Sequence, residues 1–181
     1  MSGIDMLIEH LARNRAELSD AVQSVPEQLR ETVPAEGGWS VAQVIQHLVH
    51  TDRRFGQLLM QASAQLKGHL GDDYDVDAFL QSRKLRAVLD RTFKVEAWEA
   101  IRPTEDWDAQ HAWRLLEQER RELLELVRST DGLPLGAAQH PHRILGELNL
   151  YEWIAFLGTH EARHAAQIRE IGERLGCPPA S

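Results

Sequence analysis

The sequence of 181 residues contains a single cysteine, Cys177. No disulfide can form within the chain, which is typical of proteins in a reducing compartment. The first residues also lack the basic start and apolar stretch of a secretory signal peptide. We therefore expect a cytoplasmic protein. No group near Cys177 in the sequence would lower the pKa of its thiol, so this residue is a poor candidate for a nucleophile.

Basic charge is also scarce, because 20 lysines and arginines stand against 28 aspartates and glutamates, a net charge of −8. This balance argues against binding to nucleic acid or to an anionic membrane. No uncharged apolar run is long enough for a transmembrane helix. The hydrophobic content of 43% and charged content of 27% are typical of a folded protein. We expect one domain over residues 1–181, with its core at about 4–175.

Strand patterns are nearly absent, and apolar residues recur instead with the period of an α-helix. The sequence predicts an all-α protein, a four-helix bundle with no significant sheet. The predicted long helices cover residues 4–25, 41–66, 107–128 and 145–175, with a shorter helix at 76–89.

The second long helix has the clearest start signal. Ser40 stands three residues before Gln43, which is the spacing of a capping box. Gly68 and Gly71 are expected to end this helix. The acidic stretch Asp72-Asp73-Tyr74-Asp75 that follows predicts a solvated loop.

The most informative pair of residues in the chain is His160 and His164, which lie one helical turn apart. At about 100° per residue they share the apolar face of the last helix with Leu157 and Ile168. The i, i+4 spacing brings both rings within reach of a single ion. An alternative is that both are core histidines hydrogen-bonded to other helices, which is the commoner case for an isolated pair. A third ligand would decide between the two.

The face of its helix on which each histidine lies indicates one further candidate ligand. His47 lies at the edge of the buried arc of the second helix, whereas His50 lies on nearly the opposite side. For two of the remaining histidines, exposure to solvent is as plausible as burial: His10 and His111. The other three are expected in loops: His69, His140 and His142. One histidine from the second helix and the pair from the last make a three-imidazole site, which leaves coordination positions open as catalytic zinc sites do.

These residues carry a family resemblance. The series Trp39-Ser40, Gln43 and His47-Leu48, followed about 110 residues later by His160-x-x-x-His164-x-x-Gln167, resembles the DinB-like (DinB/YfiT) metalloprotein superfamily over essentially the whole chain. The resemblance implies an up-down-down-up four-helix bundle, often a homodimer. It also implies a divalent metal ion, zinc or nickel and sometimes iron, on His47, His160 and His164.

The resemblance further implies a range of activities. Some members are thiol-dependent S-transferases or isomerases that use glutathione, mycothiol or bacillithiol, so a small-molecule substrate and a low-molecular-weight thiol are the expected partners. An ion on three neutral imidazoles keeps its double charge and can activate a bound water or thiol. Imidazole ligands suit zinc, nickel, copper and iron alike. This chain has no recognisable thiol-binding signature, which leaves the substrate open.

Two functions follow from this site. The first is a metal-dependent enzyme, a thiol S-transferase or a hydrolase. The second is a non-catalytic metal-binding stress or interaction protein, which a fourth ligand such as His50 would favour. Gln167 is predicted to orient a ligand by a hydrogen bond. Glu161 is predicted to be a surface carboxylate paired with Arg163 or Arg169, and a role beside the ion is the alternative.

Overall fold

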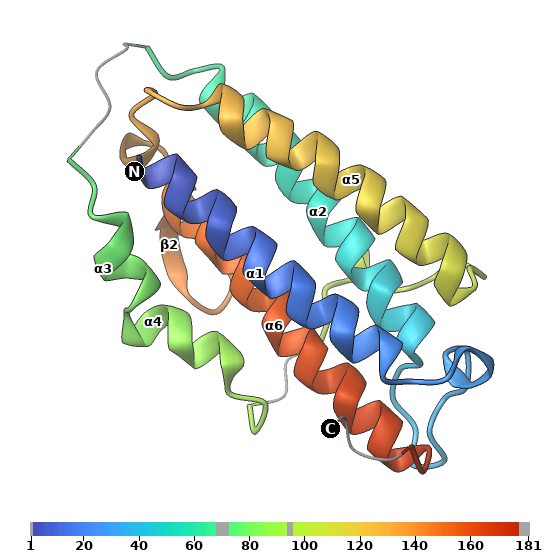
Figure 1. Cartoon of the computed structure of the whole chain (residues 1–181). Helices are drawn as coiled ribbons and strands as arrows, with labels where there is room; N and C mark the ends of the chain where they lie inside the picture. Colours follow the sequence, from blue (N-terminus) through green and yellow to red (C-terminus); the bar gives the residue numbers. More distant parts are fainter. Residues whose placement is uncertain (1, 68–72, 94–95, 178–181) are drawn as a thin grey trace.

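Figure 1 shows the fold in a computed structural model, which describes residues 2–67, 73–93 and 96–177. Four long helices form a bundle, as predicted. They are α1 (Gly3–Gln23), α2 (Val41–Ser63), α5 (Ala109–Ser129) and α6 (Leu150–Arg174). None of the helices among the described residues combines the length and the apolar character needed to cross a membrane.

The topology is the predicted up-down-down-up arrangement. In Figure 1, α1 and α6 run in one direction, while α2 and α5 run in the other. The main packing contacts join α1 to α6 and α2 to α5, so the bundle consists of two helix pairs. Because α2 and α5 are parallel, the chain has to return along the bundle between them, and residues 64–108 make this connection.

The connection is less regular than expected. A single helix at 76–89 was predicted, and this is wrong: the segment breaks because the Ser82 hydroxyl accepts a hydrogen bond from the Leu85 amide and starts a new helix. The helices are α3 (Val76–Leu80) and α4 (Arg83–Arg86). Short 3₁₀ helices are η1 (Glu27–Leu29), η2 (Ala87–Leu89), η3 (Glu99–Ile101) and η4 (Leu135–Ala137).

Two helix boundaries differ from prediction by three or more residues. α2 ends at Ser63 rather than at residue 66, and the expected stop signals Gly68 and Gly71, like residue 72 of the acidic loop, lie outside the described residues. The last helix begins at Leu150 rather than at residue 145, because the side chains of Asn149 and Glu152 form a capping box there.

A small hairpin occupies the residues before α6. Strands β1 (Gln139–His142) and β2 (Gly146–Asn149) pair antiparallel, with Gln139 opposite Asn149 and His142 opposite Gly146. Gly146 has a φ of +74°, a backbone conformation that favours glycine. This two-stranded ribbon is the sheet in the described part of the chain, and the fold class remains all-α.

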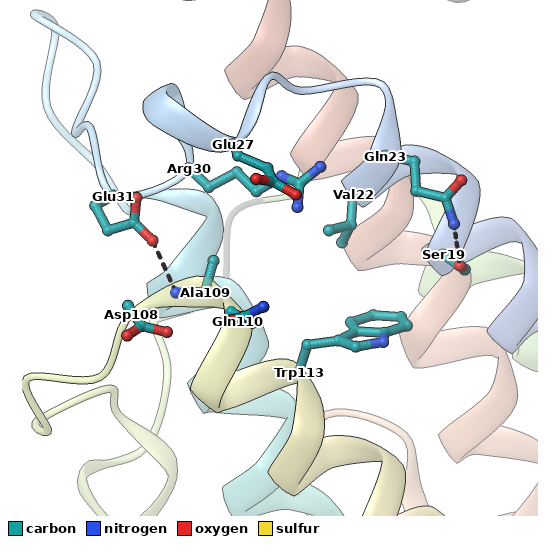
Figure 2. A pocket seen from close by; sticks show the side chains of 10 residues that line it. All are labelled: Ser19, Val22, Gln23, Glu27, Arg30, Glu31, Asp108, Ala109, Gln110 and Trp113. Carbon is teal, nitrogen blue, oxygen red and sulfur yellow. Dashed lines mark hydrogen bonds between the residues drawn. The ribbon is translucent and has the colours of Figure 1, made fainter.

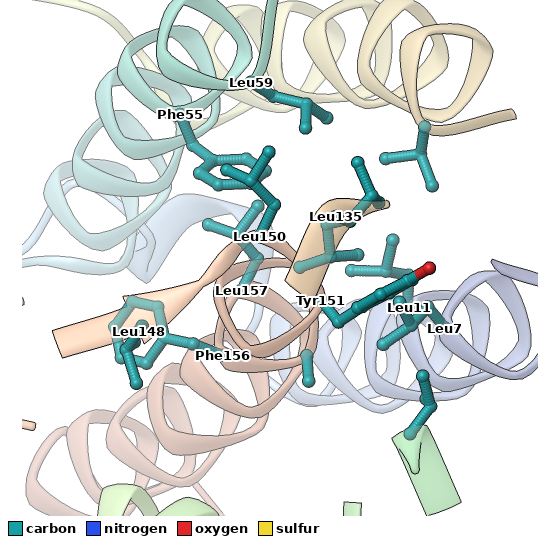
Figure 3. Packing of buried hydrophobic residues seen from close by; sticks show 14 of the residues in the cluster. Leu7, Leu11, Phe55, Leu59, Leu135, Leu148, Leu150, Tyr151, Phe156 and Leu157 are labelled. Carbon is teal, nitrogen blue, oxygen red and sulfur yellow. The ribbon is translucent and has the colours of Figure 1, made fainter. Parts of the chain in front are cut away.

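The apolar core consists of two clusters along the bundle. Figure 3 shows members of the first core cluster, including Leu7, Phe55 and Leu157. The second core cluster surrounds Leu18 and Ile45 near the other end of the helices. Burial of these side chains supplies the main driving force for bundle formation.

The α1–α6 pair packs closely at Gly158. A Cβ atom there would lie 2.6 Å from Cδ2 and 2.8 Å from Nε2 of His10. Exposure was expected to be as plausible as burial for His10, but this residue is buried, and its Nε2–H donates to the Ala155 carbonyl at 3.0 Å. The ring is therefore held in place and cannot give way cheaply.

We predict that Gly158→Ala lowers the free energy of unfolding by about 1–3 kcal/mol, because the added methyl group forces α1 and α6 apart. Urea denaturation followed by circular dichroism measures this. Gly56→Ala on α2 is the matched control, since a Cβ there meets nothing within 4 Å. That control should gain about 0.5–1 kcal/mol from its better helix propensity. Equal stabilities of the two variants would contradict the close packing.

Candidate metal centre

The structure brings the three predicted histidines together between α2 and α6. Nε2 of His160 lies 3.4 Å from Nε2 of His47 and 3.1 Å from Nε2 of His164. The ligand atoms of all three residues lie within 4.8 Å of one another. Among the described residues, this is the group of histidine, cysteine or acidic side chains that could hold a metal ion.

Capping interactions set the faces on which these histidines lie. The Ser40 hydroxyl accepts a hydrogen bond from the Gln43 amide, and the Gln43 side-chain oxygen accepts one from the Ser40 amide. This predicted capping box fixes the start of α2, so that His47 turns toward α6 and is only 3% exposed. On α6, His160 is half-buried and His164 is buried one turn further along.

Hydrogen bonds to the far ring nitrogens orient two of the three imidazoles. Nδ1–H of His47 donates to the Ile101 carbonyl at 2.7 Å, and Nδ1–H of His164 donates to Oε1 of Gln167 at 2.8 Å. A proton on Nδ1 leaves the Nε2 lone pair free, which is the form that binds a metal. The hydrogen bond predicted for Gln167 is present. The Ile101 carbonyl was missed, since a backbone acceptor leaves no signal in the sequence.

The donor set fits a divalent transition metal. Two nitrogens bound to a tetrahedral zinc ion at about 2.0–2.1 Å lie about 3.3–3.4 Å apart. The separations of 3.1 and 3.4 Å between Nε2 atoms are close to that value. Nδ1 of His160 is buried and has no hydrogen-bond partner, while its ring stacks on Phe156 with centroids 5.2 Å apart. Three converging imidazoles without bonds to acidic groups suit zinc, nickel or iron.

Burial keeps these histidines uncharged. It lowers the pKa of His47 to about 4, although the hydrogen bond to Ile101 acts in the opposite direction. Burial, followed by the neighbouring histidines, lowers the pKa values of His160 and His164 well below the ordinary value. All three ligands are thus unprotonated at neutral pH, as metal binding requires.

We predict from these directions that metal occupancy survives mild acid. Free imidazoles are half-protonated near pH 6.5, whereas a depressed pKa leaves the ligands neutral to lower pH. Metal content after dialysis at pH 7.0, 5.5 and 4.0 should therefore be nearly equal at the first two values and fall toward the last. Half-loss of the metal near pH 6.5 would contradict this.

We also predict that Gln167→Ala weakens zinc affinity by about 10–100-fold, since His164 loses the acceptor that fixes its ring. Competition with a chromophoric chelator measures the affinity. Gln118→Ala is a suitable control, because that exposed glutamine on α5 bonds only to Glu122 among the hydrogen bonds of the described residues. An unchanged affinity in the Gln167 variant would remove this residue from the site.

The other histidines among the described residues do not join the cluster. His50, predicted to face away, lies with its ring 5.7 Å from that of Trp107. His142 reaches the neighbourhood from β1, with its ring 4.4 Å from Phe156, but it is not among the converging ligands. His69 lies outside the described residues.

The prediction that Glu161 is a surface carboxylate is wrong. It is only 1% exposed, and its Oε1 accepts hydrogen bonds from Arg15 at 2.5 Å and Arg120 at 2.8 Å. The predicted partners are engaged elsewhere: Arg163 donates to backbone carbonyls of the connection, and Arg169 pairs with Glu17. The error has a physical reason, since α6 is covered on more than one face.

A separate surface pocket of about 260 Å³ lies between the end of α1 and the start of α5. Figure 2 shows Glu27 and Arg30 on one side of it and Trp113 on the other. None of the three converging histidines lines this pocket. The pocket is therefore distinct from the candidate metal centre.

Comparison with known proteins identifies the family of this chain. A family model described as the DinB superfamily matches residues 10–168. The chain belongs to the DinB superfamily. Within the superfamily, the chain is similar to the uncharacterised protein YuaE of Bacillus subtilis (strain 168), with 26% identity over 162 residues, which is 89% of this chain and 94% of YuaE.

A solved structure shows the same DinB fold. YfiT from Bacillus subtilis, described as "a probable metal-dependent hydrolase with an unusual four-helix bundle topology", matches with a TM-score of 0.61. The match covers 97% of this chain and 89% of that chain, at 19% identity. At this identity the likeness concerns the fold.

Proposed function

We propose that this DinB-superfamily protein is a metal-dependent hydrolase of a small molecule, with His47, His160 and His164 holding one divalent ion. The observation that carries this proposal is the convergence of three Nε2 atoms, to which the described residues add no fourth ligand within reach. A three-ligand centre has a position free for water or substrate. The description of YfiT as a metal-dependent hydrolase supports the same reaction type.

The side chains around the centre prepare it for this chemistry. A zinc or nickel ion held there would act as a Lewis acid that lowers the pKa of a coordinated water or thiol. The Ile101 carbonyl and Gln167 keep their histidines in the metal-binding tautomer. The rings of Trp39 and Phe156 lie 5.2 Å from those of His47 and His160 and limit the access of bulk water.

Metal depletion tests the proposal. Purified protein is analysed for metal, dialysed against a chelator, and assayed with p-nitrophenyl acetate, and in parallel with glutathione and 1-chloro-2,4-dinitrobenzene. We expect one ion per chain and an ester hydrolysis that is lost on depletion and restored by zinc or nickel.

The other outcomes each overturn part of the proposal. Metal-dependent conjugation of glutathione without ester hydrolysis would replace the hydrolase by a thiol S-transferase. A stoichiometric metal without turnover of either probe would favour the non-catalytic metal-binding protein. Hydrolysis that is unaffected by depletion would remove the metal from the reaction.

A further inference from the structure

Four charged side chains, one from each long helix, meet in the middle of the bundle. Arg15 of α1 and Arg120 of α5 both donate to Oε1 of Glu161 on α6, at 2.5 and 2.8 Å. Arg120 also binds both oxygens of Asp52 on α2, at 3.0 and 3.1 Å. Arg15 closes the circle at 3.7 Å from Asp52. We call these four residues the charged ring; its charges alternate and sum to zero.

The charged ring divides the core. On every long helix, its member lies between a residue of one core cluster and a residue of the other. The flanking pairs are Leu11 and Leu18, Val49 and Phe55, Leu116 and Leu123, and Leu157 and Ala165. Apolar side chains continue on both sides, so the ring occupies a layer that apolar residues could also fill.

Stability does not account for such a layer. Asp52, Arg120 and Glu161 are 3%, 5% and 1% exposed, so their charges have lost nearly all contact with water. Desolvation of buried ion pairs offsets their mutual attraction, and well-packed apolar replacements are often as stable or more stable. Buried atoms without hydrogen-bond partners remain on three members: Nε of Arg15, Nη1 of Arg120 and Oε2 of Glu161. The ring therefore calls for an explanation other than stability.

The position of the charged ring next to the candidate metal ligands supplies such an explanation. Glu161 directly follows the ligand His160, and Asp52 lies five residues beyond the ligand His47, about 7.5 Å along α2. The metal centre lies between α2 and α6, which belong to different helix pairs. Arg120 holds carboxylates from these same two helices on one planar guanidinium. A two-pronged contact to Asp52 is directional, so it restricts rotation as well as separation.

We propose that the charged ring positions the metal centre: by holding Asp52 of α2 and Glu161 of α6 on Arg120, it fixes where His47 lies relative to His160 and His164. The ring thereby sets the affinity and geometry of the bound ion. This inference rests on the metal binding proposed above. Arg15, Asp52, Arg120 and Glu161 are positioning residues and do not touch the ion.

Replacing all four members of the charged ring by apolar side chains tests the inference. The variant that combines Arg15→Met, Asp52→Leu, Arg120→Met and Glu161→Met removes two positive and two negative charges, so the net charge beside the ion is conserved. We expect it to melt at or above the wild-type temperature. Its zinc affinity, measured by chelator competition, should be about tenfold or more weaker, as for the loss of groups that orient ligands. The visible absorption spectrum of the cobalt-loaded protein should shift or broaden, because it reports ligand geometry.

A matched control separates positioning from stability. Leu123→Ala on α5 lies one turn from Arg120 and creates a cavity in the first core cluster without touching the ring. It should lower the melting temperature yet keep the wild-type affinity and cobalt spectrum. If the fourfold variant does not fold, the charge-conserving pair Asp52→Leu and Arg120→Met is measured in its place.

The two proposals fail in different ways. A ring variant with wild-type zinc affinity and cobalt spectrum would overturn the positioning role and leave the proposed function intact. Wild-type protein that binds neither zinc nor cobalt would overturn the proposed function itself.

Discussion

Replacing His160 by alanine should abolish stoichiometric metal binding. Its Nε2 atom lies between those of the other two ligands, at 3.1 Å from His164 and 3.4 Å from His47, so its loss leaves a pair that no longer encloses an ion. The decrease in affinity should exceed the roughly 10–100-fold loss that follows from removing an outer hydrogen-bond partner. His47→Ala and His164→Ala should behave alike. Elemental analysis after gel filtration measures the metal content.

His50→Ala provides the matched control for these variants. It removes a histidine from the same helix as His47, one turn further along, but its ring lies against Trp107 rather than in the cluster. We expect this variant to keep one ion per chain. Retention of a full equivalent by the His160→Ala protein, or its loss from the His50→Ala protein, would show that the ligands are wrongly assigned.

Breaking the charged ring at a single point should be far more damaging than removing it. Arg120→Met leaves Asp52 and Glu161 buried with only Arg15 to balance two carboxylates. Removing one partner of a buried ion pair typically costs about 3–5 kcal/mol, because an uncompensated charge stays in the core. The free energy of unfolding in urea should fall by about that amount. The apolar fourfold variant should recover it, since no buried charge is then left unpaired; Glu117, which loses Arg15 as its partner, has a side chain that is 40% exposed to water.

An ion pair on the surface serves as the control for the loss of the buried Arg120. Arg169 and Glu17 join α6 to α1 at 3.0 Å, with side chains that are 37% and 45% exposed. Exposed pairs contribute about 0–1 kcal/mol, so Arg169→Ala should change the free energy of unfolding little. A loss of less than about 1 kcal/mol in Arg120→Met would show that the ring does not hold its charges as the structure describes.

The four long helices could be predicted because each buries an apolar face, which imposes a helical period on the sequence. The start of α2 was predictable for the same kind of local reason, since Ser40 and Gln43 complete their hydrogen bonds within one turn. The hairpin of β1 and β2 could not be predicted in this way. Residues 139–142, Gln-His-Pro-His, have no alternation of apolar side chains, and these strands depend on contacts with the helix that follows.

The convergence of His47, His160 and His164 was predictable from the i, i+4 pair and the family motif, because side chains and spacing carry that signal. The charged ring was missed because its members stand more than 35 residues apart, so that no single helix indicates the partners of its charged residue. A charged residue at a core-facing position on all four helices is the signal that could have revealed it.

The pairing of α1 with α6 has a consequence for folding during synthesis on the ribosome. About 125 residues separate the end of α1 from the start of α6. At about 5–20 residues per second, a ribosome needs roughly 6–25 s to make this stretch. Throughout that time the apolar stripe of α1 has no α6 to cover it and can attract chaperones or other nascent chains. Completion of the bundle therefore waits for a long-range closing step, which a bundle of consecutive hairpins avoids.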